Sequence, residues 1–184
     1  MKLPPTVFLD VVDSTNSWLR RKAREVPAGT AVAADYQTAG RGRGDRRWHS
    51  PPGGAAMFSL LWPRGEAPRE ELGRLSVGLA RTVAELLAAD YGVKAEVKPP
   101  NDVLAGGKKL CGILLEECGD RLIVGVGINT NLDPEELPEG VDAVSLSGLC
   151  GSKIDNRRLI ERLIPAIAEY LSASLVPLTR EDNG

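Results

Sequence analysis

Two long apolar segments separated by only two residues constrain the fold of this chain most strongly. The segments are "KKLCGILLEEC" (108–118) and "RLIVGVGINTNL" (121–132), and Gly119 and Asp120 lie between them. Both are rich in branched apolar residues, which favours β-strands. A two-residue connection joins strands that run in opposite directions. The sequence therefore predicts an antiparallel hairpin.

Short apolar runs elsewhere predict four further strands, at 6–12, 29–37, 55–62 and 94–98. Apolar residues at helical spacing predict a helix over 68–92, closed by a glycine, and another over 156–174. Most strands join by hairpins while the helices lie to one side. This order predicts an α+β fold: a mixed, largely antiparallel sheet with helices packed mainly on one face.

The segment between the first two strands predicts one more helix. It begins near Thr15, after Asp13 or Ser14 as the N-cap, and runs to about Val26. Hydroxyl and amide groups in "DSTN" (13–16) lie at its start. They fit either a simple helix cap or a site for a polar ligand.

Length and charge set broad limits on the function. The chain has 184 residues, a length that fits a single domain over 1–184. Its formal net charge is -2, so its bulk charge excludes a general nucleic-acid binder. The first residues lack the apolar core of a signal peptide, and no run reaches the ~18 apolar residues of a membrane span. A cytoplasmic protein without a membrane partner is predicted. Its three cysteines form no CxxC pair, so neither a zinc site nor a disulfide framework is indicated.

The stretch "QTAGRGRGDRRWHS" (37–50) is glycine-rich and basic. It is not a dinucleotide loop, because Asp45 stands where the third glycine belongs, and it lacks the Gly-Lys-Ser/Thr ending of a P-loop. Glycines let the backbone bend closely around a ligand, and arginines offer forked donors to carboxylate or phosphate. By itself the stretch fits an anion-binding loop, a solvated surface loop or a nucleic-acid patch.

A second polar segment, "KPPNDVLAGGKK" (98–109), precedes the hairpin. Its two prolines predict an extended chain that presents Asn101 and Asp102 at the end of the preceding strand. Its two glycines predict a chain reversal before Lys108 and Lys109. Neighbours in a strand point to opposite faces, so one of these lysines can face a site. A plain hairpin with surface lysines is the alternative.

Glycines interrupt both strands of the hairpin. Gly112 leaves room for a ligand to approach the backbone, and Gly125 and Gly127 leave one face of the next strand without side chains. Something is expected to pack there. Asn129 adds an amide that can donate and accept hydrogen bonds. Close packing of the sheet or a helix is the alternative to a ligand.

Taken together, these segments resemble the catalytic domain of biotin protein ligases. The matching motifs follow the family's order over nearly the whole chain: "STN" at 14, "QTAGRGRGDRRWHS" at 37, "KPPND" at 98, "KLCGILLE" at 109 and "GINTN" at 127. The sequence departs from the family pattern in two places. Gly44 and Asp45 stand where a variable residue and a glycine are usual, and Pro99 replaces a tryptophan. The resemblance implies a biotin/lipoate ligase-like fold, related to class II aminoacyl-tRNA synthetase catalytic domains.

The resemblance also implies an activity. Such ligases activate biotin with ATP and Mg²⁺ to biotinyl-5′-AMP, release pyrophosphate, and pass biotin to one lysine of a biotin carboxyl carrier protein. The catalytic residues implied are Lys109, Arg43, Arg41 and Asp102. Biotin is assigned to Ser14, Thr15, Asn16, Gln37, Gly40, Arg41, Gly42, Arg43, Lys109 and Gly112. ATP is assigned to Arg43, Trp48, Asn101, Asp102, Lys109 and Asn129, and no protein ligand is assigned to the metal.

Further expectations concern binding partners and alternative functions. Nothing before Thr6 could hold the DNA-binding domain of some family members, so DNA binding is not expected, and the chain stops where many relatives continue into a small β-domain. A homodimer formed through a sheet edge follows by analogy. The alternatives are a lipoate ligase or octanoyl transferase, and a non-catalytic biotin- or nucleotide-binding protein.

Overall fold

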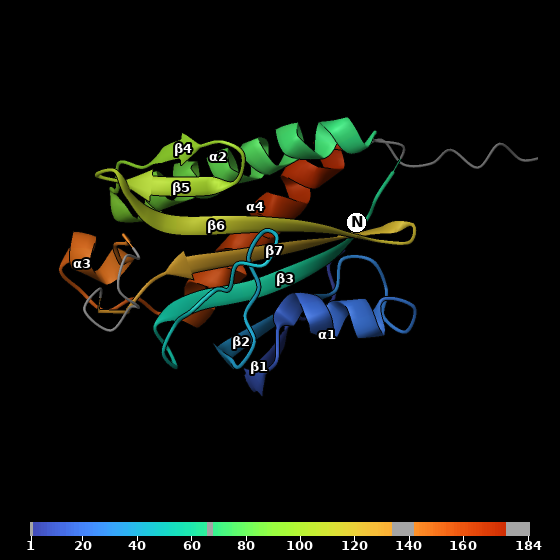
Figure 1. The fold of residues 1–184 in the computed structure, drawn as a ribbon, viewed down its shortest axis with the longest axis horizontal. Helices are drawn as coiled ribbons and strands as arrows, with labels where there is room; N and C mark the ends of the chain where they lie inside the picture. Colours follow the sequence, from blue (N-terminus) through green and yellow to red (C-terminus); the bar gives the residue numbers. More distant parts are fainter. Residues whose placement is uncertain (1, 66–67, 134–141, 176–184) are drawn as a thin grey trace, which may run out of the picture.

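A seven-stranded sheet forms the centre of the protein (Figure 1). The computed structural model describes residues 2–65, 68–133 and 142–175. In spatial order the strands are β1 (Val7–Val12), β2 (Ala31–Gln37), β3 (Ala55–Pro63), β7 (Arg121–Asn129), β6 (Lys108–Cys118), β5 (Asp102–Ala105) and β4 (Glu96–Lys98).

The strand directions follow the sequence prediction. β1 and β2 are parallel, and every other neighbouring pair is antiparallel. The mixed, largely antiparallel sheet is therefore confirmed. In the β6–β7 hairpin Cys118 pairs with Arg121, and the register continues to Cys111 opposite Ile128. The hairpin predicted around Gly119 is thus confirmed as well.

Two long helices, α2 (Leu72–Tyr91) and α4 (Asn156–Ser174), cover one face of the sheet (Figure 1). Their apolar side chains and the inward residues of the strands form the main core, with Leu79, Leu87, Leu163, Ile167 and Phe58 among its fully buried members. Burial of this apolar surface is the main force that holds the layers together. The prediction of helices mainly on one face is confirmed.

Helix α1 (Thr15–Lys22) lies on the opposite face, over a small second cluster of Leu19, Ala23, Val32, Leu61 and Ile123. It ends earlier than the predicted boundary near Val26. The backbone N–H groups of Glu25 and Val26 both turn back to the carbonyl of Lys22, so the chain leaves the helix there.

The C-terminal end of α2 matches the predicted closing glycine, and α4 begins at a side-chain cap. Gly92 adopts a left-handed conformation with φ of 68°, and its N–H donates to the Ala88 carbonyl at 3.0 Å. This is the conformation that favours glycine after a helix. Asp155 caps α4 by accepting from the Arg158 N–H at 3.0 Å.

The segment before β6 corrects the prediction of an extended chain. Pro99 and Pro100 form the turn of a hairpin in which Lys98 pairs with Asp102. Proline also fits turns, because its fixed φ is that of a turn residue. Asp102 then begins β5, which was missed because its four residues, "DVLA", are shorter than the window that reveals an alternating pattern. The short helices η1 (Arg69–Glu71) and α3 (Leu146–Cys150) were not predicted either.

The acidic stretch at 134–141 and the C-terminal residues 176–184 lie outside the described residues. Within the described ranges, the helices are too short or too polar to cross a lipid bilayer. Cys111 is completely buried in the core, and burial raises the pKa of its thiol above the usual value. Cys111 is thus a neutral packing residue.

Candidate active site

The face of the sheet that carries α1 is nearly bare at its central strands. A Cβ atom added at Gly127 would lie 2.8 Å from the Trp48 ring, and one at Gly112 would lie 3.2 Å from the same ring. A Cβ atom at Gly125 would overlap the Asn16 amide. These glycines therefore admit side chains from other segments, as the glycine pattern of β7 predicted.

A cavity lies between this face and the loop that joins β2 to β3. Most of the predicted site residues line it: Ser14, Thr15, Asn16, Gln37, Arg41, Gly42, Arg43, Trp48, Asn101, Asp102, Lys109 and Gly112. Gly40 and Asn129 lie outside this lining and contact residues that belong to it. The Trp48 N–H donates to the Gly40 carbonyl at 3.1 Å, and Asn129 Nδ2 donates to the Lys109 carbonyl at 3.0 Å.

The start of α1 forms one end of the cavity. Ser14 is the N-cap, and its side chain accepts from a backbone N–H of the first turn. Both the N–H and the Oγ1 of Thr15 lie within hydrogen-bond distance of Gln37 Oε1, at 2.7 and 3.1 Å. The "STN" motif and the end of β2 are thus joined directly.

Ser59 of β3 lies beneath this contact and is fully buried. Its Oγ lies 2.7 Å from Thr15 Oγ1 and also contacts Asn16 Oδ1. Sequence reasoning assigned Ser59 no role. A signal was present, because Ser59 is the one hydroxyl in the otherwise apolar run "AAMFSLLW" (55–62), and a buried polar group requires a partner.

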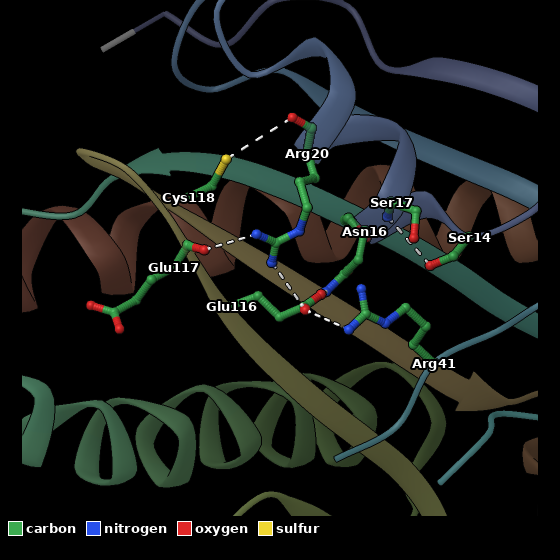
Figure 2. A network of polar contacts seen from close by, with 9 residues as sticks. Ser14, Asn16, Ser17, Arg20, Arg41, Glu116, Glu117 and Cys118 are labelled. Carbon is green, nitrogen blue, oxygen red and sulfur yellow. Dashed lines mark hydrogen bonds and ion pairs between the residues drawn. The ribbon is translucent and has the colours of Figure 1, made fainter. Parts of the chain in front are cut away.

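Glu116 of β6 is the second residue that the sequence left without a role. Asn16 Nδ2 donates to Glu116 Oε2 at 2.7 Å, and the guanidinium groups of Arg20 and Arg41 lie 3.0 and 2.9 Å from Glu116 Oε1 (Figure 2). Glu116 belongs to the "KLCGILLE" motif. Together with Ser59 it holds both ends of the Asn16 amide.

Lys109 lies at the other end of the cavity. Its Nζ lies 2.8 Å from Asp102 Oδ1 and 5.8 Å from the centre of the Trp48 ring. Asp102 pairs with Gly112 across the β5–β6 ladder, which fixes the carboxylate beside this lysine. Asn101 donates from Nδ2 to the Ile113 carbonyl at 2.8 Å. The "KPPND" and "KLCGILLE" motifs are thus brought side by side.

The loop that joins β2 to β3 contains the basic part of "QTAGRGRGDRRWHS" (37–50) and is called the Arg-rich loop below. It folds back on itself over the cavity. Arg41 and Arg47 form an isolated antiparallel bridge, and the Gly42 N–H donates to the Arg46 carbonyl at 2.8 Å. Gly44 lies at the tip with φ of 61°, a conformation that favours glycine. The change from the family pattern at this position therefore places a glycine where the turn requires one.

Trp48 and Arg43 connect this loop to the sheet. Arg43 Nη1 donates to Asn101 Oδ1 at 3.3 Å. The Trp48 ring packs over Gly112 and Gly127. Its indole N–H is buried and has no hydrogen-bond acceptor within the described parts of the chain. A buried indole N–H beside a cavity is a donor that a ligand can use.

The charges around the cavity are mainly positive. Arg41, Arg43, Arg46, Arg47 and Lys109 line it, against the single lining carboxylate of Asp102. Such a site suits a ligand with several negative charges. In the described ranges His, Cys, Asp and Glu side chains do not gather in a group of three that could hold a metal ion. The site therefore offers a cationic cradle, in which Asp102 pairs with Lys109 and Glu116 pairs with Arg41.

An α+β domain with a cationic cavity on one face of its sheet is suited to bind an anionic ligand. The model of the biotin/lipoate A/B protein ligase family matches residues 8–133, and the chain belongs to this family. The match includes all five motifs and the strands that carry them.

The chain is also similar in sequence to individual biotin ligases. The bifunctional ligase/repressor BirA of Bacillus subtilis is 36% identical over 94% of this chain and 56% of its own length. The biotin–(acetyl-CoA-carboxylase) ligase of Paracoccus denitrificans is 34% identical over 86% of this chain and 69% of its own length. The chain thus spans about half to two thirds of the length of these relatives.

A solved structure is similar in fold as well as in sequence. The biotin protein ligase of Aquifex aeolicus, in complex with biotin and ATP, superposes with a TM-score of 0.82 and is 37% identical. The match covers 92% of this chain and 71% of that one. The sheet and the helices described above are therefore those of a biotin protein ligase catalytic domain.

Proposed function

We propose that this chain is an ATP-dependent biotin protein ligase with a single catalytic domain. It joins the carboxylate of biotin to the α-phosphate of ATP, forming biotinyl-5′-AMP and releasing pyrophosphate. It then transfers the biotinyl group to a lysine of a biotin carboxyl carrier protein. The names of the similar proteins support the reaction and the carrier.

The observation that carries this proposal is the position of Lys109 at the cavity. The first reaction brings a carboxylate onto a polyphosphate, and the two repel each other. Lys109 projects into the cavity from β6 while Arg41 and Arg43 approach from the loop. Cations on both sides offset the repulsion and stabilise charge that develops on the phosphate. The pairing of Lys109 with Asp102 keeps its ammonium oriented before ligands arrive.

In this proposal the biotin side of the site is the end at α1. The uncharged ureido ring needs donors and acceptors, and Ser14, Thr15, Asn16 and Gln37 supply hydroxyl and amide groups there. The buried hydroxyl of Ser59 fixes their orientation from below. Gly112 gives the biotin tail access to the backbone, and Gly40, Arg41 and Gly42 close the loop over it.

The nucleotide side is the end at Asn101 and Asp102. Arg43 and Trp48 approach it from the loop, and the orphan indole N–H offers a donor to a ligand oxygen or nitrogen. Asn129 acts through the backbone of Lys109, which it holds by a hydrogen bond. A magnesium ion would be held mainly by the phosphates of ATP, as is usual for Mg²⁺ at nucleotide sites. There it would offset phosphate charge.

The intermediate must be shielded from water before the second reaction. The amine of the carrier lysine attacks the acyl carbon, the bond from that carbon to the phosphate oxygen breaks, and AMP leaves. The mixed anhydride also reacts with water, so a loop that folds over it protects it until the carrier arrives. A homodimer, the lack of DNA binding and the cytoplasmic location stay predictions.

Biotin-dependent exchange of pyrophosphate into ATP tests the first reaction. We expect exchange with biotin and little with lipoate, because the polar end of the cavity matches a ureido ring. Exchange with lipoate alone would instead establish the lipoate ligase alternative. Biotin binding without exchange would establish a non-catalytic binding protein, and a lack of both binding and exchange would refute the proposal.

A further inference from the structure

Glu116 joins three segments that are distant in the sequence (Figure 2). Its Oε2 accepts a hydrogen bond from Asn16 at the start of α1, and its Oε1 lies 3.0 Å from Arg20 Nη2 in the same helix. Its third partner is Arg41 of the Arg-rich loop, at 2.9 Å. Asn16 and Glu116 are 100 residues apart in the chain.

The carboxylate is much less exposed than its cationic partners. The side chain of Glu116 is 12% exposed, whereas those of Arg20 and Arg41 are 41% and 43% exposed. A buried ionised carboxylate requires paired charges or several donors. Two guanidinium groups and one amide meet this requirement. An amide at position 116 would keep the hydrogen bond from Asn16 and lose the attraction to both arginines.

The contacts of Glu116 are arranged unequally. Arg20 is held a second time, because its Nη1 donates to the Glu117 carbonyl at 3.1 Å. Asn16 is held a second time by Ser59. Both of these partners belong to α1, which also packs on the sheet through Leu19. Arg41 belongs instead to a loop whose own backbone hydrogen bonds run mostly within the loop. Loss of the Glu116 charge should therefore affect the loop more than α1.

We propose that Glu116 is a positioning residue that latches the Arg-rich loop to the biotin end of the site through Arg41. The latch aligns Arg41 and Asn16 together, so that closing the loop and orienting the ligand-binding amide are one event. It holds the loop near its start, while Arg43 and Trp48 hold it on either side of the tip at Gly44. The effect on the ligand rests on the proposed function, whereas the effect on the loop does not.

The first test concerns the loop without any ligand. Trypsin cleaves after arginine, and Arg46 and Arg47 lie exposed near the tip of the loop. We expect Glu116→Gln to raise the rate of cleavage after these residues about three- to tenfold, because an ion pair with a largely buried carboxylate is lost. Mass spectrometry identifies the cut bonds. Thermal unfolding of each variant verifies that the fold persists.

Glu117→Gln is the matched control. Glu117 is the next residue of β6, points to the other side of the strand and pairs with Arg64 at 2.6 Å, away from the loop. It should leave the cleavage rate near that of the unchanged protein. In an Arg41→Gln background, Glu116→Gln should add little further cleavage, because both changes remove the same contact. Additive effects, or equal effects of the two glutamate variants, would overturn the latch.

The second test uses biotin-dependent pyrophosphate exchange. If the proposed function holds, Glu116→Gln should raise KM for biotin about fivefold or more and change kcat by a smaller factor, because it loosens Asn16 and the loop at Arg41 while Lys109 keeps its pairing with Asp102. A fall in kcat with unchanged KM would contradict positioning. If the unchanged protein shows no exchange, the ligase proposal fails, and the cleavage experiment still decides the latch.

Discussion

Lys109 and Lys108 are neighbours in β6 with different surroundings. Lys109 lines the cavity beside Asp102, whereas Lys108 is exposed and lies 3.7 Å from Asp142. The alternation of side chains along a strand predicts that only one of them faces the site. The structure places Lys109 there, and Lys109 is the lysine to which the resemblance to biotin protein ligases assigns a catalytic role.

This difference predicts opposite effects of two similar substitutions. Lys109→Ala should lower the rate of biotinyl-5′-AMP formation by about a hundredfold or more, because it removes a cation from the reacting carboxylate and phosphate. Lys108→Ala should change the rate by less than about twofold, since it removes a surface ion pair. Single-turnover formation of labelled adenylate measures both. A larger loss in Lys108→Ala would reverse the assignment.

Residues with polar side chains in apolar strands were the hardest to assign. Ser59 is signalled by its polarity in the apolar run of β3, and Glu116 by its place in the "KLCGILLE" motif. The partners that satisfy them, Thr15, Asn16 and Arg41, come from other parts of the chain. Sequence reasoning could flag the need for partners but could not say which residues would meet it.

At the scale of elements, the loop between β2 and β3 supplies more of the residues that line the cavity than any single strand or helix of the described parts of the chain. Its glycines make ordering it costly in backbone entropy, and its contacts with the sheet are few and mostly polar. A ligand that bridges the sheet and the loop would offset this cost. We therefore expect the loop to open and close in solution and to close over bound adenylate.

Protease sensitivity measures this closure. Biotin with ATP should slow tryptic cleavage at residues 40–50 about tenfold or more, because the bound adenylate adds contacts to both the sheet and the loop. Cleavage elsewhere in the chain provides the internal reference. ATP with a biotin analogue that lacks the carboxylate should protect less. Equal cleavage with and without ligands would contradict the closing loop.

The elements themselves were predicted unevenly. The helix over 156–174 and the β6–β7 hairpin agree with the structure because long periodic patterns and a two-residue turn are local signals. The early end of α1 and the turn at Pro99 were missed, because each depends on how the chain joins its neighbours. β5 was missed because its four residues are too few to show an alternating pattern, and it becomes a strand by pairing with both β4 and β6.

For the whole molecule, carboxylates in ion pairs predict how stability depends on pH. Arg21 donates two hydrogen bonds to Asp13 and lowers the pKa of that carboxyl to about 2. Arg162 of α4 likewise lowers the pKa of Asp90 in α2. A depressed pKa in the folded state contributes stability that is complete above the unfolded value. This stability is lost as the pH falls through the pKa of the carboxyl in the folded state.

Asp13→Asn tests this dependence. Above about pH 5 it should lower the free energy of unfolding by less than about 1 kcal/mol, because the pair is exposed and screened by solvent. The difference from the unchanged protein should shrink as the pH falls from about 4 to about 2. Urea unfolding at pH 7, 4 and 2.5 measures it. A difference that grows in acid would have the wrong sign.

The sequence by itself determined the fold class, the order of the motifs and the chemistry of an anion-binding site. These follow from local periodicity, from turn residues and from side-chain types, which do not depend on distant contacts. Through the resemblance to biotin protein ligases it also predicts that Lys109 and the arginines share one ligand, and these residues line one cavity.

Only the tertiary structure decided how the site is held. The strand order β3-β7-β6 places Ser59 and Glu116 on either side of the glycines of β7, so that both reach Asn16. The pairing of β5 with β6 brings Asp102 to Lys109, and the fold of the loop over the sheet brings Arg41 to Glu116. Contacts between residues far apart in a chain depend on which strands become neighbours. That choice is made by burying the whole core, and not by any one segment.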